Sequence, residues 1–206
     1  MARENGEESA GGGERPPDGR EAVRGLDQVE HQLDAGLPPV HLWNPPHCGE
    51  IDMRIRRDGT WEYMGSPIRR APLVRLFSTI LRRDPDGCYY LVTPVEKIRI
   101  QVDDAPFVAV RLDVEGGPGP DTALRFTTNL GDETVAGPDA PIRVETDPET
   151  GEPSPYVLVR ANLEALMARP VFYELTEQGV EREGPEGKVL GVWSRGAFFP
   201  LGQVER

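Results

Sequence analysis

Cysteine and lysine are scarce in this 206-residue chain, which has two cysteines and, among 23 basic residues, only the lysines Lys97 and Lys188. Two cysteines without a CxxC spacing exclude a disulfide-rich scaffold and a structural zinc site built on cysteines. A single Cys48–Cys88 bridge is left open. Two reduced thiols are the expected state, because thiols in the cytoplasm normally stay reduced.

Long apolar runs are also missing. No segment approaches the ~18 apolar residues that a membrane-spanning helix needs. The N-terminus lacks the basic-then-apolar layout of a secretory signal. We therefore expect a cytoplasmic protein without a membrane partner.

An excess of basic charge is absent as well, since the formal net charge is −12. A nucleic-acid partner is not expected, because binding it requires a basic surface that displaces counterions. The charge is uneven: residues 42–105 carry ten basic and nine acidic groups, whereas residues 106–206 carry nine and seventeen. An acidic second half leaves room for a basic protein partner.

Glycine and proline are abundant, with 23 and 21 residues, which predicts a turn-rich chain of many short strands. Residues 1–20 contain almost no apolar side chain and are expected to form a disordered tail. Residues 21–36 are expected to contain a short amphipathic helix, because Leu26, Val29 and Leu33 recur at helical spacing.

The first half predicts an α+β domain over residues 37–115. Apolar residues alternate from Ile51 to Ile55, and a turn over residues 57–60 predicts a hairpin. An apolar stripe after Pro72 predicts a helix that ends with Arg82 and Arg83. Three strands are expected to follow, and the last two, near residues 97–102 and 107–114, are expected to pair with each other.

The second half predicts a further domain, over residues 121–206, with a similar element order. We expect a hairpin near residues 142–159, a two-turn helix that carries Leu163, Leu166 and Met167, a strand at residues 171–175, and two closing strands. The repeated order suggests duplication. The predicted fold class is therefore α+β, with two tandem units of mainly antiparallel sheet, each with a hairpin and one packed helix, plus a short N-terminal helix.

Five motifs in the first half carry a family resemblance: Trp43-Asn44-Pro45, Gly49-Glu50-Ile51-Asp52, Asp58-Gly59-x-Trp61, Gly65-x-Pro67-Ile68 and Thr93-Pro94-Val95-Glu96-Lys97. With weaker motifs over roughly residues 38–200, the chain resembles the proteobacterial family of domain of unknown function 1285. The resemblance implies a two-part α+β structure with repeated motifs. It also implies a proposed but unproven connection to signal transduction, and no assigned catalytic residues.

The residues favoured as a ligand-binding site lie in the Pro-rich loop, the first hairpin and the segment 65–70. They are Trp43, Asp52, Trp61, Arg69 and Arg70. Arginine binds carboxylate or phosphate in bidentate fashion, so Arg69 or Arg70 could hold a small anionic ligand near the start of the following helix. For these arginines and tryptophans taken singly, the favoured interpretation is that the paired arginines form ion pairs with acidic residues of the chain itself, and that the tryptophans belong to the core.

Lys97 is a further candidate, as one of only two lysines. A desolvated lysine can act as a base or form a Schiff base, but a structural salt bridge is the favoured interpretation because no partner base is evident. None of Ser66, Ser78, Ser154 and Ser194 lies in a GxSxG elbow, which argues against nucleophilic hydrolysis.

Weak metal candidates lie within twelve residues of the sequence: His41, His47, Cys48, Glu50 and Asp52. All are competent ligands, but no zinc spacing is matched. The favoured hypothesis is a non-enzymatic small-ligand-binding or regulatory module that needs no cofactor. The alternatives are a metal-assisted enzyme that uses His47, Glu50 and Asp52, and an adaptor that docks a protein through its acidic second half.

Overall fold

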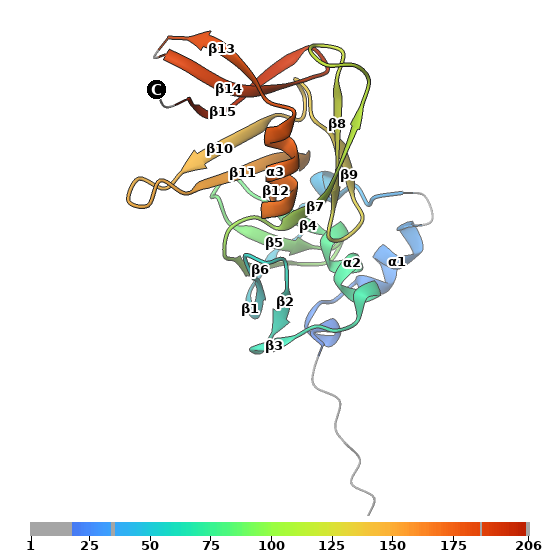
Figure 1. The fold of residues 1–206 in the computed structure, drawn as a ribbon. Helices are drawn as coiled ribbons and strands as arrows, with labels where there is room; N and C mark the ends of the chain where they lie inside the picture. Colours follow the sequence, from blue (N-terminus) through green and yellow to red (C-terminus); the bar gives the residue numbers. More distant parts are fainter. Residues whose placement is uncertain (1–17, 34–35, 186, 205–206) are drawn as a thin grey trace, which may run out of the picture.

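The computed structural model describes residues 18–33, 36–185 and 187–204, which form α-helices and strands in a mixed α+β arrangement (Figure 1). The helices are α1 (Leu26–Leu33), α2 (Ala71–Thr79) and α3 (Arg169–Glu177). Two 3-10 turns, η1 (Arg20–Ala22) and η2 (Val40–Leu42), flank α1 in the sequence.

The first sheet has six strands in the order β3-β2-β1-β6-β5-β4. Its strands are β1 (His47–Ile55), β2 (Trp61–Tyr63), β3 (Ser66–Pro67), β4 (Leu81–Arg83), β5 (Tyr89–Val92) and β6 (Lys97–Val102). The expected hairpin is β1–β2, in which Ile55 pairs with Trp61. All neighbours are antiparallel except the central pair β1–β6.

The second sheet has the order β10-β11-β12-β7-β8-β9, again with one parallel pair, β12–β7, at its centre. Its strands are β7 (Phe107–Glu115), β8 (Ala123–Thr128), β9 (Glu133–Val135), β10 (Ile142–Thr146), β11 (Pro153–Arg160) and β12 (Leu163–Met167). If each unit's strands are numbered one to six, both sheets have the order 3-2-1-6-5-4. The two units therefore share a strand topology as well as a fold class.

A third, three-stranded antiparallel sheet closes the chain with β13 (Val180–Gly184), β14 (Gly187–Ser194) and β15 (Ala197–Gln203). It lies at the end of the second unit that is far from the first, and α3 connects it to β12 (Figure 1). The buried Ser194 hydroxyl donates to the Ala136 carbonyl and accepts from the Leu124 amide. These two bonds fix the third sheet to the second.

The N-terminal segment packs on the first unit through the buried side chains of Val23, Leu26 and Val29. The predicted helix over residues 21–36 is confirmed as α1. Of the expected disordered tail, residues 1–17 lie outside the described part of the chain. Asp18 and Arg20, by contrast, form ion pairs with Arg70 and Glu30, so this end of the predicted tail is structured.

Three local predictions are wrong. Leu81–Arg83 is strand β4 rather than the end of the helix, because Leu81 pairs with Leu91 of β5. Residues 163–167 form strand β12, and residues 171–175 belong to α3, so helix and strand are exchanged there. The strand over residues 107–114 exists, but it pairs with β8 and β12 rather than with β6. The sheets therefore divide at residues 103–106, before β7, and not after residue 115.

Candidate functional site

The two units meet where the turn of the first hairpin reaches the second sheet. Arg57, in that turn, donates to Ser154 Oγ of β11 over 2.9 Å and forms a 2.9 Å ion pair with Asp104. Asp104 lies in the segment that joins the units. One arginine of the first unit is thus held by both the linker and the second sheet.

Asp104 is also held from the second unit. The Tyr156 hydroxyl donates to Asp104 Oδ1 over 2.8 Å. Two effects raise the pKa of Tyr156 to about 12: burial, which is the larger, and this hydrogen bond to a carboxylate. The guanidinium of Arg143 lies 4.1 Å from the centroid of the Tyr156 ring and makes an ion pair with Glu164. The linker carboxylate is therefore part of a polar network that continues across the second sheet.

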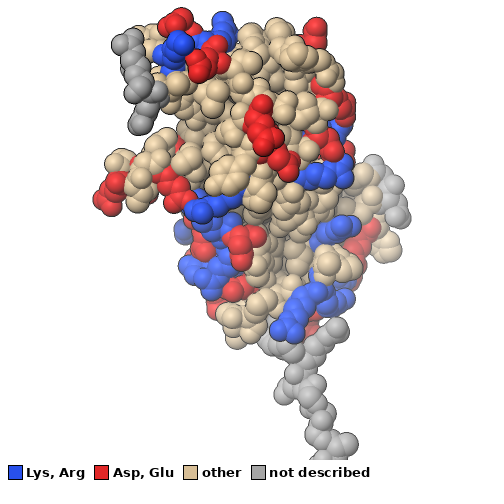
Figure 2. All heavy atoms as spheres, in the orientation of Figure 1, with Lys and Arg blue, Asp and Glu red and all other residues tan. Residues whose placement is uncertain are grey.

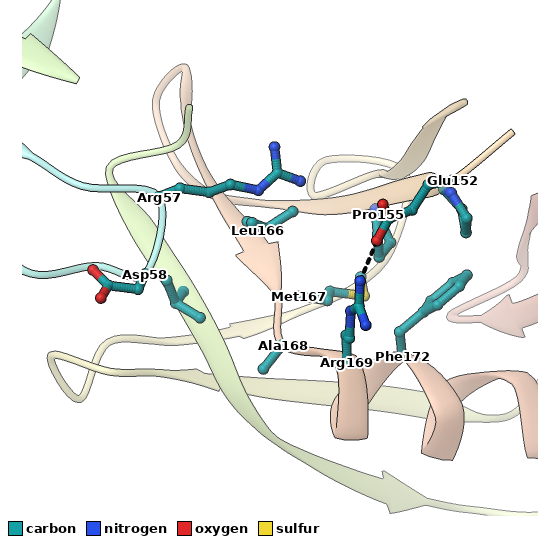
Figure 3. Close-up of a pocket in the computed structure, with 11 residues that line it drawn as sticks. Arg57, Asp58, Glu152, Pro155, Leu166, Met167, Ala168, Arg169 and Phe172 are labelled. Carbon is teal, nitrogen blue, oxygen red and sulfur yellow. Dashed lines mark hydrogen bonds and ion pairs between the residues drawn. The ribbon is translucent and has the colours of Figure 1, made fainter. Parts of the chain in front are cut away.

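A cavity of about 500 Å³ lies beside this network, with walls from both units (Figure 3). The first unit contributes Arg57 and Asp58, and β11, β12 and α3 contribute most of the rest. The apolar lining consists of Val108, Pro153, Pro155, Leu166, Met167, Ala168 and Phe172. Figure 3 shows Leu166 and Met167 between the side chains of Arg57 and Arg169. The cavity thus has an apolar interior and charged groups at its margin.

The margin of the cavity next to α3 carries an exposed ion pair. Arg169, the first residue of α3, donates to Glu152, which precedes β11, and this pair is drawn as a dashed line in Figure 3. Both side chains are exposed, at 78% and 58% of their surface. Ala168, the residue before the helix, provides no side-chain cap for the first-turn amides.

A second hollow, of about 460 Å³, adjoins the first through Arg57 and Asp58. It is polar, and its arginines are paired within the chain, as in the 2.8 Å bond from Arg56 to Glu62. Hydrogen bonds from Thr60, the strongest from its backbone amide, hold the pKa of Asp58 below its usual range. This hollow offers no unpaired cation.

We call the cavity between the two units the junction cavity. None of the six ligand-binding candidates from the sequence, Lys97 included, lines it. Trp61 is buried in the core and stacks on Phe77, with ring centroids 6.1 Å apart. Asp52 and Arg69 are exposed, and Arg70 is paired with Asp18. These residues therefore lie outside the junction cavity, although the hairpin turn that contains Arg57 does reach it.

Lys97 and Trp43 lie together at another place, beside η2. Lys97 makes a 2.8 Å ion pair with Asp84, and its ammonium lies 4.5 Å from the centroid of the Tyr90 ring. Arg82 binds the same Asp84 and donates to the Trp43 carbonyl over 2.8 Å. These contacts match the structural salt bridge that was favoured for Lys97.

The weak metal candidates His47, Cys48 and Glu50 lie exposed along β1. The His47 ring nitrogen contacts the Gly49 carbonyl at 2.9 Å, and Glu50 accepts a bond from Gln101. In the described residues, His, Cys, Asp and Glu side chains form no group of three or more that could hold a metal ion. Cys48 and Cys88 are both free thiols.

Most of the cavity residues were missed in the sequence because the second half was assigned the wrong elements. Leu163, Ala165 and Met167 are buried at every second position of β12. The sequence does not show this alternation clearly, because Leu166 is apolar as well, so helical spacing fits the same segment. Because residues 163–167 were predicted to form a helix, Leu166 and Met167 were not recognised as residues that line a cavity.

Charge differs between the two units. In Figure 2 many blue groups lie over the lower, first unit, whereas red groups are prominent over the second.

In the described part of the chain, no helix is long and apolar enough to cross a membrane.

Comparisons with known proteins place the chain among uncharacterised domains. Residues 38–105 match the N-terminal domain of domain of unknown function 1285, and residues 106–201 match the C-terminal domain. The chain is 54% identical to a protein of this family from Silicibacter pomeroyi DSS-3, whose crystal structure superposes with a TM-score of 0.79. That match covers 88% of this chain and 97% of the other.

A second crystal structure, of a family protein from Shewanella baltica OS155, is 28% identical, with a TM-score of 0.48. This match covers 61% of this chain and 91% of the other. No curated protein matches the chain.

Proposed function

Because the chain belongs to the family of domain of unknown function 1285, whose description names no activity, we propose a function from the geometry. The protein is a small-ligand-binding module that holds an amphipathic organic anion in the junction cavity. The observation that carries this proposal is an apolar cavity of about 500 Å³, walled by both units and flanked by Arg57 and Arg169.

The size and lining of the cavity support a small-molecule ligand. Ligand pockets typically measure roughly 300–1,000 Å³, occur preferentially where domains meet, and combine apolar walls with a few polar groups. The walls of Leu166, Met167 and Phe172 suit a short aliphatic or aromatic body. A guanidinium at the margin suits a carboxylate on that body, because arginine binds carboxylates through paired donors.

The lining favours binding over nucleophilic catalysis. Among the described lining residues there is no Ser, Thr, Cys, His or Lys side chain, and the only carboxylates are Asp58 and Glu152. Nucleophilic catalysis needs an activated nucleophile with a neighbouring base. Since both units form the walls, a bound ligand also bears on how the units are joined, which is the physical basis for a regulatory or signal-transducing use.

Calorimetric titration of the full chain with octanoate tests the proposal. We expect saturable binding to one site. Ala168→Phe fills the cavity without removing a backbone hydrogen bond, so it should weaken binding at least about tenfold. Ala71→Phe, at the exposed start of α2, is the matched control and should bind as the wild type does. Absence of binding by a folded wild-type protein, or equal binding by both variants, would contradict the proposal.

The two alternatives predict other results. A metal-assisted enzyme using His47, Glu50 and Asp52 predicts metal in protein purified without an affinity tag. An adaptor acting through the acidic second unit predicts a basic protein partner whose affinity falls steeply with salt. Neither alternative uses the junction cavity, so a cavity-filling variant should leave both properties unchanged.

A further inference from the structure

Arg57 and Arg169 approach the junction cavity from opposite sides, but they are held in different ways. Arg57 is bonded to Ser154 and paired with Asp104, whose side chain is only 14% exposed. Asp104 accepts a further hydrogen bond from Tyr156. A ligand that drew Arg57 away would leave a largely buried carboxylate without its cation, which is costly. Arg57 is therefore committed to the junction.

Arg169 is held much less firmly than Arg57. In the described residues its ion pair is with Glu152 alone, and both side chains are largely exposed. Exposed pairs contribute little, because water and salt screen them and two long side chains must be ordered. If a ligand carboxylate replaces Glu152 as the partner of Arg169, the Glu152 side chain is hydrated instead, at little cost in free energy. Of the two arginines, Arg169 is the one that can change partner.

The Glu152–Arg169 ion pair also lies where a ligand in the cavity can reach it. Glu152 and Arg169 both line the cavity, and their contact lies beside Pro155 and Met167 in Figure 3. Glu152 ends the turn that begins at Asp147, and the Glu152 carbonyl accepts the Asp147 amide over 3.0 Å. The backbone beside Glu152 is thereby fixed, while its side chain remains exposed.

We propose that Glu152 is a resident competitor that occupies Arg169 until a ligand carboxylate replaces it. This inference rests on the proposed function and specifies it further. The ligand class is a carboxylate with an apolar body, Arg169 is the residue that selects for the negative charge, and Glu152 limits affinity. No covalent step is involved, since one carboxylate exchanges for another at the same guanidinium.

The test is calorimetric titration of the full chain with octanoate and, in parallel, with the uncharged octan-1-ol. Releasing an exposed ion pair changes an equilibrium by about fivefold at most. Glu152→Gln should therefore bind octanoate about threefold to fivefold more tightly than the wild type. Arg169→Gln should bind it about threefold to fivefold more weakly, because the ligand loses its cation. Octan-1-ol affinity should be the same for all proteins.

Glu149→Gln is the matched control, because it removes the same charge from the same exposed turn. It should change octanoate affinity less than twofold. An unchanged or weaker affinity of Glu152→Gln, or an equal gain in Glu149→Gln, would overturn the competitor role while leaving octanoate binding by the wild type intact. Failure of all these folded proteins to bind octanoate would overturn the proposed function together with this inference.

Discussion

Arg57 in the turn of the first hairpin donates a 2.9 Å hydrogen bond to the hydroxyl of Ser154 in β11. A residue of the first unit is thus fixed to the second sheet, and the same guanidinium is paired with Asp104 in the linker. The junction cavity lies directly beside this contact. Stability of the junction and ligand binding can therefore be tested with separate residues.

Arg57→Ala should lower the free energy of unfolding by about 2 kcal/mol, because it leaves the largely buried Asp104 carboxylate without its ion pair. The expected loss is smaller than for a fully buried pair, since the Arg57 side chain is 60% exposed and its charge is partly screened. Urea unfolding of the full chain measures it. Arg69→Ala is the control, an exposed arginine that should change stability by less than about 0.5 kcal/mol. Equal effects of the two variants would argue against the role of Arg57.

Tyr156 should make stability fall at alkaline pH. Its pKa is raised from the usual 10 to about 12 in the folded protein, so the folded state holds the proton more tightly than the unfolded state. The resulting stabilisation is complete below pH 10 and is lost as the pH rises towards 12, by at most about 1.4 kcal/mol per pH unit.

Tyr156→Phe removes this group, so the variant should lose less stability than the wild type between pH 10 and 12. Urea unfolding at several pH values measures the difference. Tyr90, whose pKa is also raised to about 12, chiefly by its hydrogen bond to Asp86, remains in both proteins and supplies the same background. Parallel loss of stability in the two proteins would show that Tyr156 does not carry the effect.

The sequence predicted the fold class and most strands of the first unit, because there the apolar period and the turn residues agree. At Leu81–Arg83 the helical stripe continued into a segment that pairs with β5, and this long-range pairing is not visible in a local pattern. For Leu163–Met167, positions at helical and at alternating spacing are both apolar. Local periodicity could not decide between them, and the pairing with β7 and β11 does.

The candidate site was less predictable than the fold. The junction cavity combines the turn at Arg57 with Glu152, Leu166 and Phe172, which are about a hundred residues away along the chain. Trp61, expected to contact a ligand, instead fills the core against Phe77. A cavity that depends on how two units meet cannot be read from motifs within one of them.

Glu96 should hold the N-terminal segment on the first unit. Its buried carboxylate accepts the Arg24 backbone amide at 2.5 Å and the Arg24 side chain at 2.6 Å. Glu96→Ala should reduce stability by about 2 kcal/mol, mainly through the backbone contact, since the Arg24 side chain is exposed. Hydrogen exchange of residues 19–29 should become faster. Glu174→Gln, exposed on α3, is the control, and unchanged exchange in Glu96→Ala would contradict the prediction.

Two neighbouring aromatic residues of α3 lie in different surroundings. Phe172 lines the cavity and is half-buried, whereas Tyr173 is 63% exposed. Phe172→Ala should weaken octanoate binding about fivefold or more and cost about 2 kcal/mol of stability, since only part of the ring is buried. Tyr173→Ala should leave both nearly unchanged. Calorimetry and thermal unfolding test this pair, and similar binding by the two variants would place the ligand elsewhere.

Ligand binding in the junction cavity can be observed directly in a crystal structure of the protein soaked with 8-bromooctanoate, in which anomalous scattering locates the bromine. We expect one strong bromine peak inside the junction cavity, among Leu166, Met167 and Phe172, with the carboxylate at Arg169. A bromine peak at another site, or an empty cavity in crystals that hold the compound elsewhere, would contradict the proposed function.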